Sequence, residues 1–502
     1  MRAFAMSLFP FVFLCAAASL AQEQSLTATP ATTTSGAAYI THVTVIDTEN
    51  GKEAQDRTVV ISRHRISEVR DSNGVKAPTG SKVVDGTGKY LIPGLWDMHV
   101  HAFTFSEGST GSVTTMPPEM YFRLAIANGV TGFREMGGPE TPDDLASLRH
   151  GGSSGSALVP KLFAAGPVLD GPKPTWPQHS VSVKTEQEGR EAVRKIKSGG
   201  FDFVKVYNGV PREAYSGIAQ EAREQGISFV GHVPLSISAL QASTAGQKSI
   251  EHFSRVLTAC SSQENEIDAM FQDAIAKGQP IFPLIAKAQQ IQLSTYDTSK
   301  ARALFETFAK NQTWQVPTFT QQRAFAYLDD KEFRTDSRLV YIPAEVEKSW
   351  DPQTDFRMKW LTPDDWKRAK QIYEKSFEIA RQMHRQGVRF LAGTDLVNAY
   401  IFSGFSLHDE LGLLTKAGLS NLEALQAATW NAALFLNASD KYGSVAPGKI
   451  ADLVLLDADP LKDIHNTTRI SEVFLSGKEF DRTALDQILR NAEAATKPAA
   501  AK

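Results

Sequence analysis

The chain has 502 residues, and its 53 lysines and arginines nearly balance its 56 aspartates and glutamates, for a formal net charge of −3. Because basic residues are interspersed with acidic ones, there is no electrostatic basis for nucleic acid or an anionic membrane as a partner. The length exceeds that of a usual single domain, but parallel βα barrels with insertions run from about 250 to over 400 residues.

The first residues have the features of a secretory signal. Met1-Arg2 gives a positive start, Leu8 to Leu14 form an apolar run, and Ser19-Leu20-Ala21 is a small-x-small cleavage site. The apolar run is well short of the roughly 20 residues that a membrane span needs. We therefore predict a signal peptide over 1–21, no membrane anchor in the mature chain, and a periplasmic or secreted protein.

The mature chain is expected to keep a single cysteine. Cys15 leaves with the signal peptide and Cys260 remains, so no internal disulfide can form despite the oxidising destination. Residues 22–37 are rich in Thr, Ser, Ala and Gln and are expected to be a disordered spacer.

Two segments of alternating apolar and polar residues flank the middle of the chain. Residues 38–90 and 436–485 have this strand-like alternation, with turn sequences such as Glu49-Asn50-Gly51. We expect the two segments to pair into one small β-sandwich domain. Residues 486–502, with an end rich in Ala and Lys, are expected to be a C-terminal tail.

Between these segments, apolar strand-like runs alternate with helical patterns. After Lys205, for example, Pro211 begins a helix whose inner face includes Ile218, and Gly226 ends it. Repetition of this unit predicts a (β/α)8 TIM barrel over residues 91–435. The runs end near His101, Arg134, Ala165, Lys205, His232, His252, Pro317 and Asp395.

Residues of metal-ligand type stand at the ends of these runs, where the catalytic groups of a parallel βα barrel lie. In His99-Val100-His101, both imidazoles project to one face of a strand, because side chains alternate with a period of two. Two neutral imidazoles can hold one divalent ion, and zinc takes such ligands. The predicted metal ligands are His99, His101, Lys205, His232, His252 and Asp395.

Lys205 is the unusual member of this set, because an ammonium group cannot bind a metal ion. Its neutral amine can react with carbon dioxide to give a carbamate, N6-carboxylysine, which is an anionic ligand able to bridge two ions. His232 and His252 would complete the second metal site, and Asp395 would complete the first. The alternative is a snorkelling surface lysine, which the flanking apolar residues disfavour.

With these residues the chain resembles the amidohydrolase superfamily, and within it the imidazolonepropionase-like and prolidase-like metal-dependent hydrolases. The resemblance runs from about residue 38 to about 482 and rests on residues 91–101, 129–134 and 446–457. It implies a TIM-barrel hydrolase with divalent metal ions, and Lys205 favours the binuclear, prolidase-like branch. Glu135 is a departure, since many relatives carry aspartate there.

These residues favour metal-assisted hydrolysis of an amide. A hydroxide bridging two ions, zinc by preference, would attack the carbonyl, and Asp395 would accept its proton and pass it to the leaving amine. Tyr207, His179 and Arg134 are candidates for binding a substrate carboxylate or oxyanion. Alternatively, Tyr207 is a buried core residue, His179 is an ordinary loop residue, and Arg134 forms a salt bridge. Asp97 is expected to orient a histidine.

We therefore expect an exported amidohydrolase of the dipeptidase or carboxypeptidase type, acting on a small amide such as an Xaa-Pro or Xaa-basic dipeptide. N-acyl-amino-acid amidases, cyclic amide hydrolases and lactonases use the same ligands and remain alternatives, and a metal-containing binding protein is the non-enzymatic one. Residues 321–370 are expected to be either a lid or an ordinary helical insertion. The oligomeric state stays open, a homo-oligomer included.

Overall fold

A computed structural model describes residues 36–103, 116–138, 141–155 and 157–497. The signal peptide expected over 1–21 and nearly all of the spacer expected over 22–37 lie outside these residues. Among the described helices, none combines the length and the apolar character that crossing a bilayer requires.

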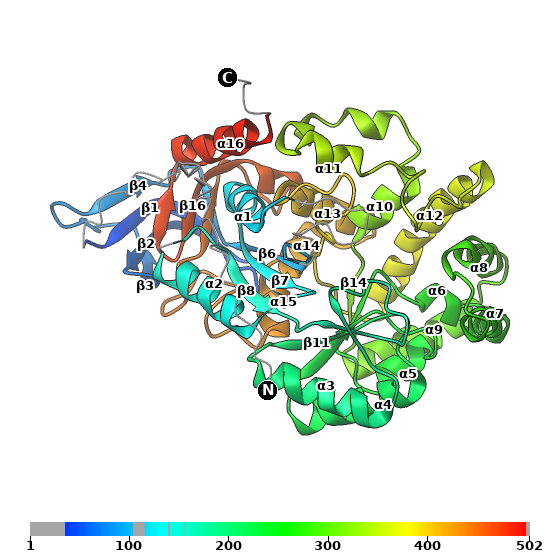
Figure 1. Cartoon of the computed structure of the whole chain (residues 1–502). Coiled ribbons are helices and arrows are strands. Elements are labelled where there is room, and N and C mark those ends of the chain that lie inside the picture. Colours follow the sequence, from blue (N-terminus) through cyan, green and yellow to red (C-terminus); the bar gives the residue numbers. More distant parts are fainter. Residues whose placement is uncertain (1–35, 104–115, 139–140, 156, 498–502) are drawn as a thin grey trace, which may run out of the picture.

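Strands from both ends of the described chain form one sheet, on the left of Figure 1, in the order β17-β16-β15-β5-β1-β2-β3, with β4 paired to β1. The antiparallel pairing of β5 with β15, which joins Pro93 to Leu453, connects the two segments. Hydrogen bonds thus place them in one eight-stranded sheet, rather than in the two sheets of the expected sandwich. Ile40, Val59 and Leu455 are buried in one cluster, which explains the alternating sequence pattern. The strands are β1 (Ala38–Ile46), β2 (Glu53–Ser62), β3 (Arg65–Asp71), β4 (Lys82–Asp85), β5 (Tyr90–Pro93), β15 (Leu453–Leu456), β16 (Ile470–Leu475) and β17 (Lys478–Phe480).

Parallel strands form the middle of the chain. One sheet contains β6, β7 and β8, and the other has the order β10-β9-β11-β12-β13-β14. All the expected strand ends except the one before Asp395 fall in or directly after one of these strands. The strands are β6 (Leu95–Val100), β7 (Val130–Glu135), β8 (Lys161–Ala164), β9 (Val168–Asp170), β10 (Ser180–Ser182), β11 (Phe203–Val206), β12 (Ser228–Gly231), β13 (Ser249–Glu251) and β14 (Trp314–Val316).

The segment before Asp395 is not a regular strand. An isolated parallel bridge links it to β14, another links the residue after Asp395 to β6, and a further bridge links the residue after β8 to β11. The bridged pairs are Gln315–Phe390, Val100–Leu396 and Ala165–Phe203. The fold is therefore α/β, with parallel strands whose carboxyl ends carry the predicted ligands.

Helices surround the parallel strands and form most of the right-hand side of Figure 1. α4 shows why they form: it begins after Pro211, and Ala214, Ile218 and Ala222 are buried on one face, as the sequence pattern predicts. The helices are α1 (Pro118–Ala127), α2 (Pro142–Ser154), α3 (Glu186–Ser198), α4 (Arg212–Glu224), α5 (Ala239–Thr244), α6 (Val256–Ala259), α7 (Glu264–Ala276), α8 (Phe282–Ser294), α9 (Thr298–Asn311), α10 (Phe319–Tyr327), α11 (Ala344–Lys348), α12 (Pro363–Arg385), α13 (Phe405–Lys416), α14 (Asn421–Ala427), α15 (Trp430–Phe435) and α16 (Arg482–Thr496), with 3-10 turns η1 (Glu332–Thr335), η2 (Ser337–Tyr341) and η3 (Ile464–Thr468).

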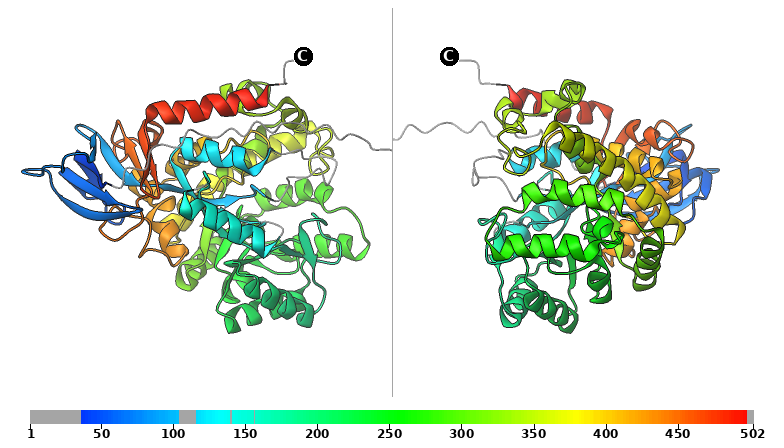
Figure 2. Two further views of the ribbon diagram at one scale, coloured as in Figure 1. Left: turned by 60° about the vertical axis from the view of Figure 1, so that its left-hand side comes forward. Right: turned by 90° about the vertical axis from the view of Figure 1, so that its right-hand side faces the viewer.

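The chain beyond residue 486 differs from the expected tail. It continues α16 to Thr496, and Asp481 caps this helix by accepting a hydrogen bond from the backbone N–H of Ala484. Leu485 and Ala492 are buried, and the helix packs on α1, as the left view of Figure 2 shows. An apolar face at helical spacing thus outweighs the Ala- and Lys-rich composition.

Candidate metal centre

The predicted ligands His99, His101 and Asp395, here called the first ligand set, converge where β6 ends. The Nε2 atoms of His99 and His101 each lie 3.3 Å from Oδ1 of Asp395 and 3.3 Å from each other. Ligand atoms at about 2.0–2.1 Å from a tetrahedral zinc ion are separated from one another by about 3.3 Å. These side chains therefore already have the spacing of one face of a zinc site.

The other predicted ligands, Lys205, His232 and His252, form the second ligand set. Lys205 lies in β11, and the two histidines directly follow β12 and β13. The ring centroids of His232 and His252 are 4.9 Å apart, and Nε2 of His252 lies 4.0 Å from Oδ2 of Asp395. Asp395 therefore lies between the two sets, and one cavity of about 200 Å³ is lined by members of both.

Lys205 has an environment that suits a carbamate. It is fully buried, and its Nζ has no hydrogen-bond partner among the described residues. Burial lowers the pKa of this amine to about 8, against the opposing effect of the Glu251 and Asp395 carboxylates. A buried ammonium without an acceptor is costly, whereas a carbamate would place an anionic group between the two sets. The donor set present therefore fits two divalent ions.

Three of the histidines are each held by a hydrogen bond through Nδ1. Such a bond places the proton on Nδ1 and leaves Nε2 as the atom that can face a metal ion. No sequence pattern singled out the acceptors, because each of them lies far along the chain from the histidine that it holds. Glu251, for example, precedes His252 in the sequence but holds His99. The acceptors are Oε2 of Glu251 for His99 at 2.8 Å, Oδ1 of Asn208 for His232 at 2.9 Å, and Oγ1 of Thr318 for His252 at 2.6 Å.

Burial and neighbouring charges set the protonation states. Burial lowers the pKa of His99 and His232 well below the usual value, and that of His252 to about 4. Burial would raise the pKa of Asp395, but interactions with His252 and His101 outweigh it and lower this pKa to about 2. At neutral pH the imidazoles are neutral and the carboxylate is ionised, and these are the forms that bind metal ions.

Glu251 also explains the position of Arg134. Nη2 of Arg134 donates to Oε2 of Glu251 at 2.7 Å, and the same guanidinium donates to Ser249 and to the carbonyl oxygen of Met98. Both charged side chains are fully buried. The predicted role of Arg134 in binding a substrate carboxylate is therefore wrong: its charge is already neutralised by Glu251, as a buried charge must be.

Asp97 supports the turn that carries Asp395, rather than the ring of a histidine. Its Oδ1 and Oδ2 accept hydrogen bonds from the backbone N–H and the hydroxyl of Thr394, at 3.0 and 2.6 Å. Its Oδ1 also accepts from the backbone N–H of His99, at 3.2 Å. Asp395 and His252 have positive φ values of 62° and 57°. Such backbone is unfavourable outside glycine and persists where its surroundings enforce it.

The other two predicted substrate contacts, Tyr207 and His179, both line the 200 Å³ cavity. The ring centroid of Tyr207 lies 4.1 Å from that of His232, and its Oη accepts a hydrogen bond from Nε1 of Trp176 at 3.2 Å. Burial raises the pKa of Tyr207 to about 12, so its hydroxyl keeps its proton and can donate a hydrogen bond. His179 is half-buried directly before β10.

The insertion over 321–370 forms one wall of this cavity. Nδ2 of Asn398 donates to Oδ2 of Asp395 at 2.8 Å, and Nη1 of Arg357 in turn donates to Oδ1 of Asn398 at 3.0 Å. Arg357 pairs with Asp355 and lies 4.8 Å from the ring centroid of Phe325. These contacts run from the insertion to a predicted metal ligand, and no pattern in the sequence pointed to them.

A model of the amidohydrolase family matches residues 90–480. Adenine deaminase of Oleidesulfovibrio alaskensis is 35% identical over 113 residues, which make up 22% of this chain. The match covers only 18% of that curated relative.

Solved structures resemble the whole fold. Bottromycin amidohydrolase has a TM-score of 0.70 at 22% identity, over 91% of this chain and 90% of that one. A putative prolidase from Bifidobacterium longum has a TM-score of 0.63 at 22% identity, over 91% and 99%. An Xaa-Pro dipeptidase with bound methionine has a TM-score of 0.61 at 19% identity, over 89% and 100%. Because the family model spans most of the chain, the protein belongs to the amidohydrolase family and is a hydrolase.

Proposed function

We propose that the protein is an exported, binuclear metal-dependent amidohydrolase that cleaves an amide bond next to a free carboxylate. The observation that carries the proposal is the meeting of both ligand sets at Asp395, beside the buried amine of Lys205. Xaa-Pro and Xaa-basic dipeptides are the leading substrates, and a prolidase and an Xaa-Pro dipeptidase are among the similar structures.

The parallel strands would close into a (β/α)8 barrel. Isolated bridges support this closure: they link the end of β8 to β11, β14 to the segment before Asp395, and Leu396, directly after Asp395, to β6. Closure would bring the carboxyl ends of all the strands to one face, where active sites of such barrels lie.

The first ligand set would hold one divalent ion, His232 and His252 the other, and carboxylated Lys205 would bridge them. Zinc suits this combination of nitrogen and oxygen donors. When bound, the ions would polarise the scissile carbonyl and lower the pKa of a water molecule. Elemental analysis of protein purified without chelator should give about two zinc ions per chain, whereas about one ion with full activity would reject the binuclear proposal.

The protein's own groups would handle the proton and hold the substrate. Asp395 is ionised, so it can accept the proton of the attacking water and return it to the departing nitrogen. Tyr207 keeps its hydroxyl proton and can donate a hydrogen bond to the oxygen that gains charge. His179, on the same cavity wall, would donate a hydrogen bond to the substrate carboxylate.

A release assay over dipeptides and N-acyl amino acids, with zinc and bicarbonate supplied, tests the proposed reaction. We expect release of the C-terminal amino acid. Amidating the substrate's carboxylate should lower kcat/KM by about a hundredfold, roughly the 2–3 kcal/mol of a lost charge-assisted contact. Equal rates on the acid and its amide would reject carboxylate recognition and favour a lactonase or a cyclic amidase.

Export is a separate part of the proposal, and residues 1–21 support it by their sequence. Protein recovered from the periplasm or the medium should begin at Gln22 when its N-terminus is sequenced. Recovery of the uncleaved chain from the cytosol alone would contradict export.

A further inference from the structure

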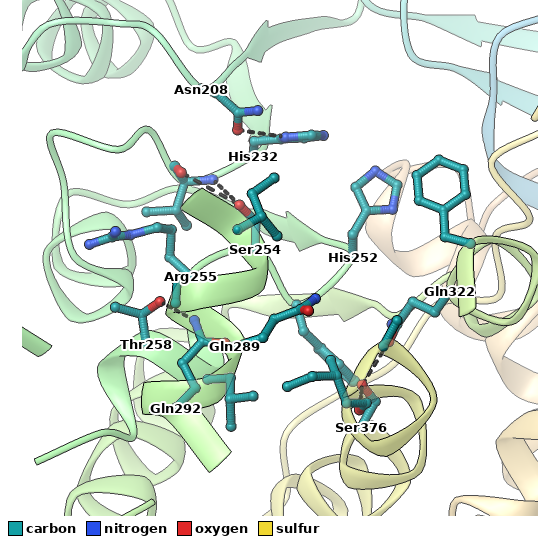
Figure 3. Close-up of a pocket in the computed structure, with 18 of the residues that line it drawn as sticks. Asn208, His232, His252, Ser254, Arg255, Thr258, Gln289, Gln292, Gln322 and Ser376 are labelled. Atoms are coloured by element: carbon teal, nitrogen blue, oxygen red, sulfur yellow. Dashed lines mark hydrogen bonds between the residues drawn. The ribbon is translucent and has the colours of Figure 1, made fainter. Parts of the chain in front are cut away.

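A second cavity, of about 380 Å³, adjoins the metal centre and is here called the apolar chamber. Figure 3 looks into it, with His232 and His252 on one side and Gln322 and Ser376, from α10 and α12, on another. The chamber is nearly twice as large as the 200 Å³ cavity. Both cavities are bordered by Asn208, His232, His252, Phe282, Gln321 and Phe325.

Most of the chamber wall is apolar. The side chains come from the segments after β12 and β13, from α7, α8, α10 and α12, and from the residue before α8; Ile285 of α8 is 39% exposed. Apolar side chains that face an unfilled space forgo the dispersion contacts of a packed core, and an apolar ligand would restore them. They include Leu257, Ile281, Ile285, Ile372 and Ile379.

Two pairs of polar side chains on the wall are satisfied by each other. Oγ of Ser376 donates to Oε1 of Gln322 at 2.7 Å, and Nε2 of Gln292 donates to Oγ1 of Thr258 at 2.8 Å; both bonds are drawn in Figure 3. A ligand therefore need not supply hydrogen-bond partners to these groups. The burial of apolar surface is then the main gain on binding.

The two cavities differ in charge, and this difference orients the substrate. The 200 Å³ cavity is lined by Lys205, Asp395 and Arg357, among others. Apart from the two histidines, the wall has one basic side chain among the described residues, Arg255, and no acidic one. Asp268 pairs with Nη2 of Arg255, whereas Nε and Nη1 are buried without a hydrogen-bond partner among the described residues. The amino-acid part of a substrate suits the first cavity, and an apolar acyl part suits the second.

We infer that the apolar chamber binds the acyl side of the substrate, and that this acyl group is a fatty chain rather than a short or polar group. The inference rests on the proposed function, because it assigns the other side of the same amide bond, and it favours N-acyl amino acids over the dipeptides named there as leading substrates. Water adds across the C–N bond: the acyl carbon takes the hydroxyl group, the nitrogen takes the proton, and a fatty acid and a free amino acid leave.

A chain-length series tests the inference with the zinc-loaded mature chain. The substrates are N-acetyl, N-butanoyl, N-octanoyl and N-dodecanoyl derivatives of the amino acid that is released fastest from dipeptides. Each methylene that becomes buried should raise kcat/KM by about two- to fourfold, so octanoyl should exceed acetyl by on the order of a hundredfold or more. If kcat/KM stays constant or falls with acyl chain length while dipeptides are cleaved, the inference is overturned and the proposed function stands.

If no compound is hydrolysed, the proposed function fails, and binding then decides about the chamber. N-octanoylglycine and N-acetylglycine are titrated into the zinc-loaded protein by calorimetry. Binding of the octanoyl compound that is tighter by tenfold or more supports an acyl site, and equal binding overturns it.

Substitutions in the chamber wall test whether the preference for a long acyl group arises there. Ala369 of α12 lines the chamber and is half-buried, and Ala309 of α9 is also half-buried but lies outside the chamber wall. Ala369→Phe should lower the octanoyl-to-acetyl ratio of kcat/KM by tenfold or more, whereas Ala309→Phe should not change it. Should Ala369→Phe not fold, Ile285→Glu, at an exposed position, adds a charge to the wall and should lower the same ratio. An unchanged ratio in the folded variant overturns the inference.

Discussion

The two ligand sets of the metal centre differ in how complete they are. In the first, His99, His101 and Asp395 already have the mutual spacing of zinc ligands. In the second, His232 and His252 are in place, but the amine of Lys205 has no partner among the described residues. Folding alone therefore brings the first set together, whereas under the proposed function the second would need a chemical modification as well.

Asp395→Asn should have the largest effect, because this carboxylate contacts both sets. We expect kcat to fall by about a thousandfold to ten-thousandfold, since the proton acceptor is lost. Zinc content should fall in the same variant, because a neutral amide replaces an anionic ligand. Activity within tenfold of the parent would show that another group moves the proton.

Lys205→Ala should act mainly on the second ligand set, which keeps only its two histidines in this variant. The variant should keep about one zinc ion per chain and lose about a thousandfold in turnover, the several kcal/mol that a metal ion supplies to the transition state. Added short carboxylic acids should restore part of the rate by occupying the bridging position. Two zinc ions and an ordinary rate in this variant would mean that Lys205 is only a strand residue.

Glu251→Gln should weaken the first ligand set by a smaller amount. Loss of the carboxylate that holds Nδ1 of His99 should lower zinc affinity by about 10- to 100-fold, measured by competition with a chelator. Glu221→Gln is the matched control, because Glu221 is also a buried glutamate paired with an arginine, but lies on α4. Equal losses in the two variants would point to general destabilisation.

The smallest expected effect is that of pH on the rate at which metal-free protein takes up its second zinc ion. This rate tests the second ligand set. Burial lowers the pKa of Lys205 to about 8, so the neutral amine that reacts with carbon dioxide becomes scarcer below this pH. At a fixed concentration of dissolved carbon dioxide, uptake of the second zinc ion should become about tenfold faster from pH 6 to pH 7 and level off above pH 8. A rate independent of pH over this range would argue against a carbamate.

The convergence of the predicted ligands could be predicted from the sequence, because each of them marks the end of an apolar run and parallel strands bring such ends together. Their supporting contacts could not. Asn208 and Thr318 meet histidines on neighbouring strands, and the meeting depends on the register between strands rather than on spacing along the chain. Arg134 was misjudged for the same reason, since its partner Glu251 lies on a distant strand.

The fold shows a similar division. The order of strands and helices follows from periodicity, and so does the pairing of the two terminal β segments. The irregular run before Asp395 and the length of helix α16 could not be predicted from periodicity. In the first case tertiary hydrogen bonds replace a regular strand, and in the second a buried face at Leu485 and Ala492 outweighs a composition typical of a frayed end.

The pairing of β5 with β15 also has a consequence in time. During synthesis Pro93 emerges long before Leu453, its partner across the sheet. Until then β5 is an open edge with unpaired backbone groups, and such edges can pair with other chains. Completion of the sheet is therefore a late event of folding. A chain truncated before β15 should aggregate, rather than fold into a less stable version of the same molecule.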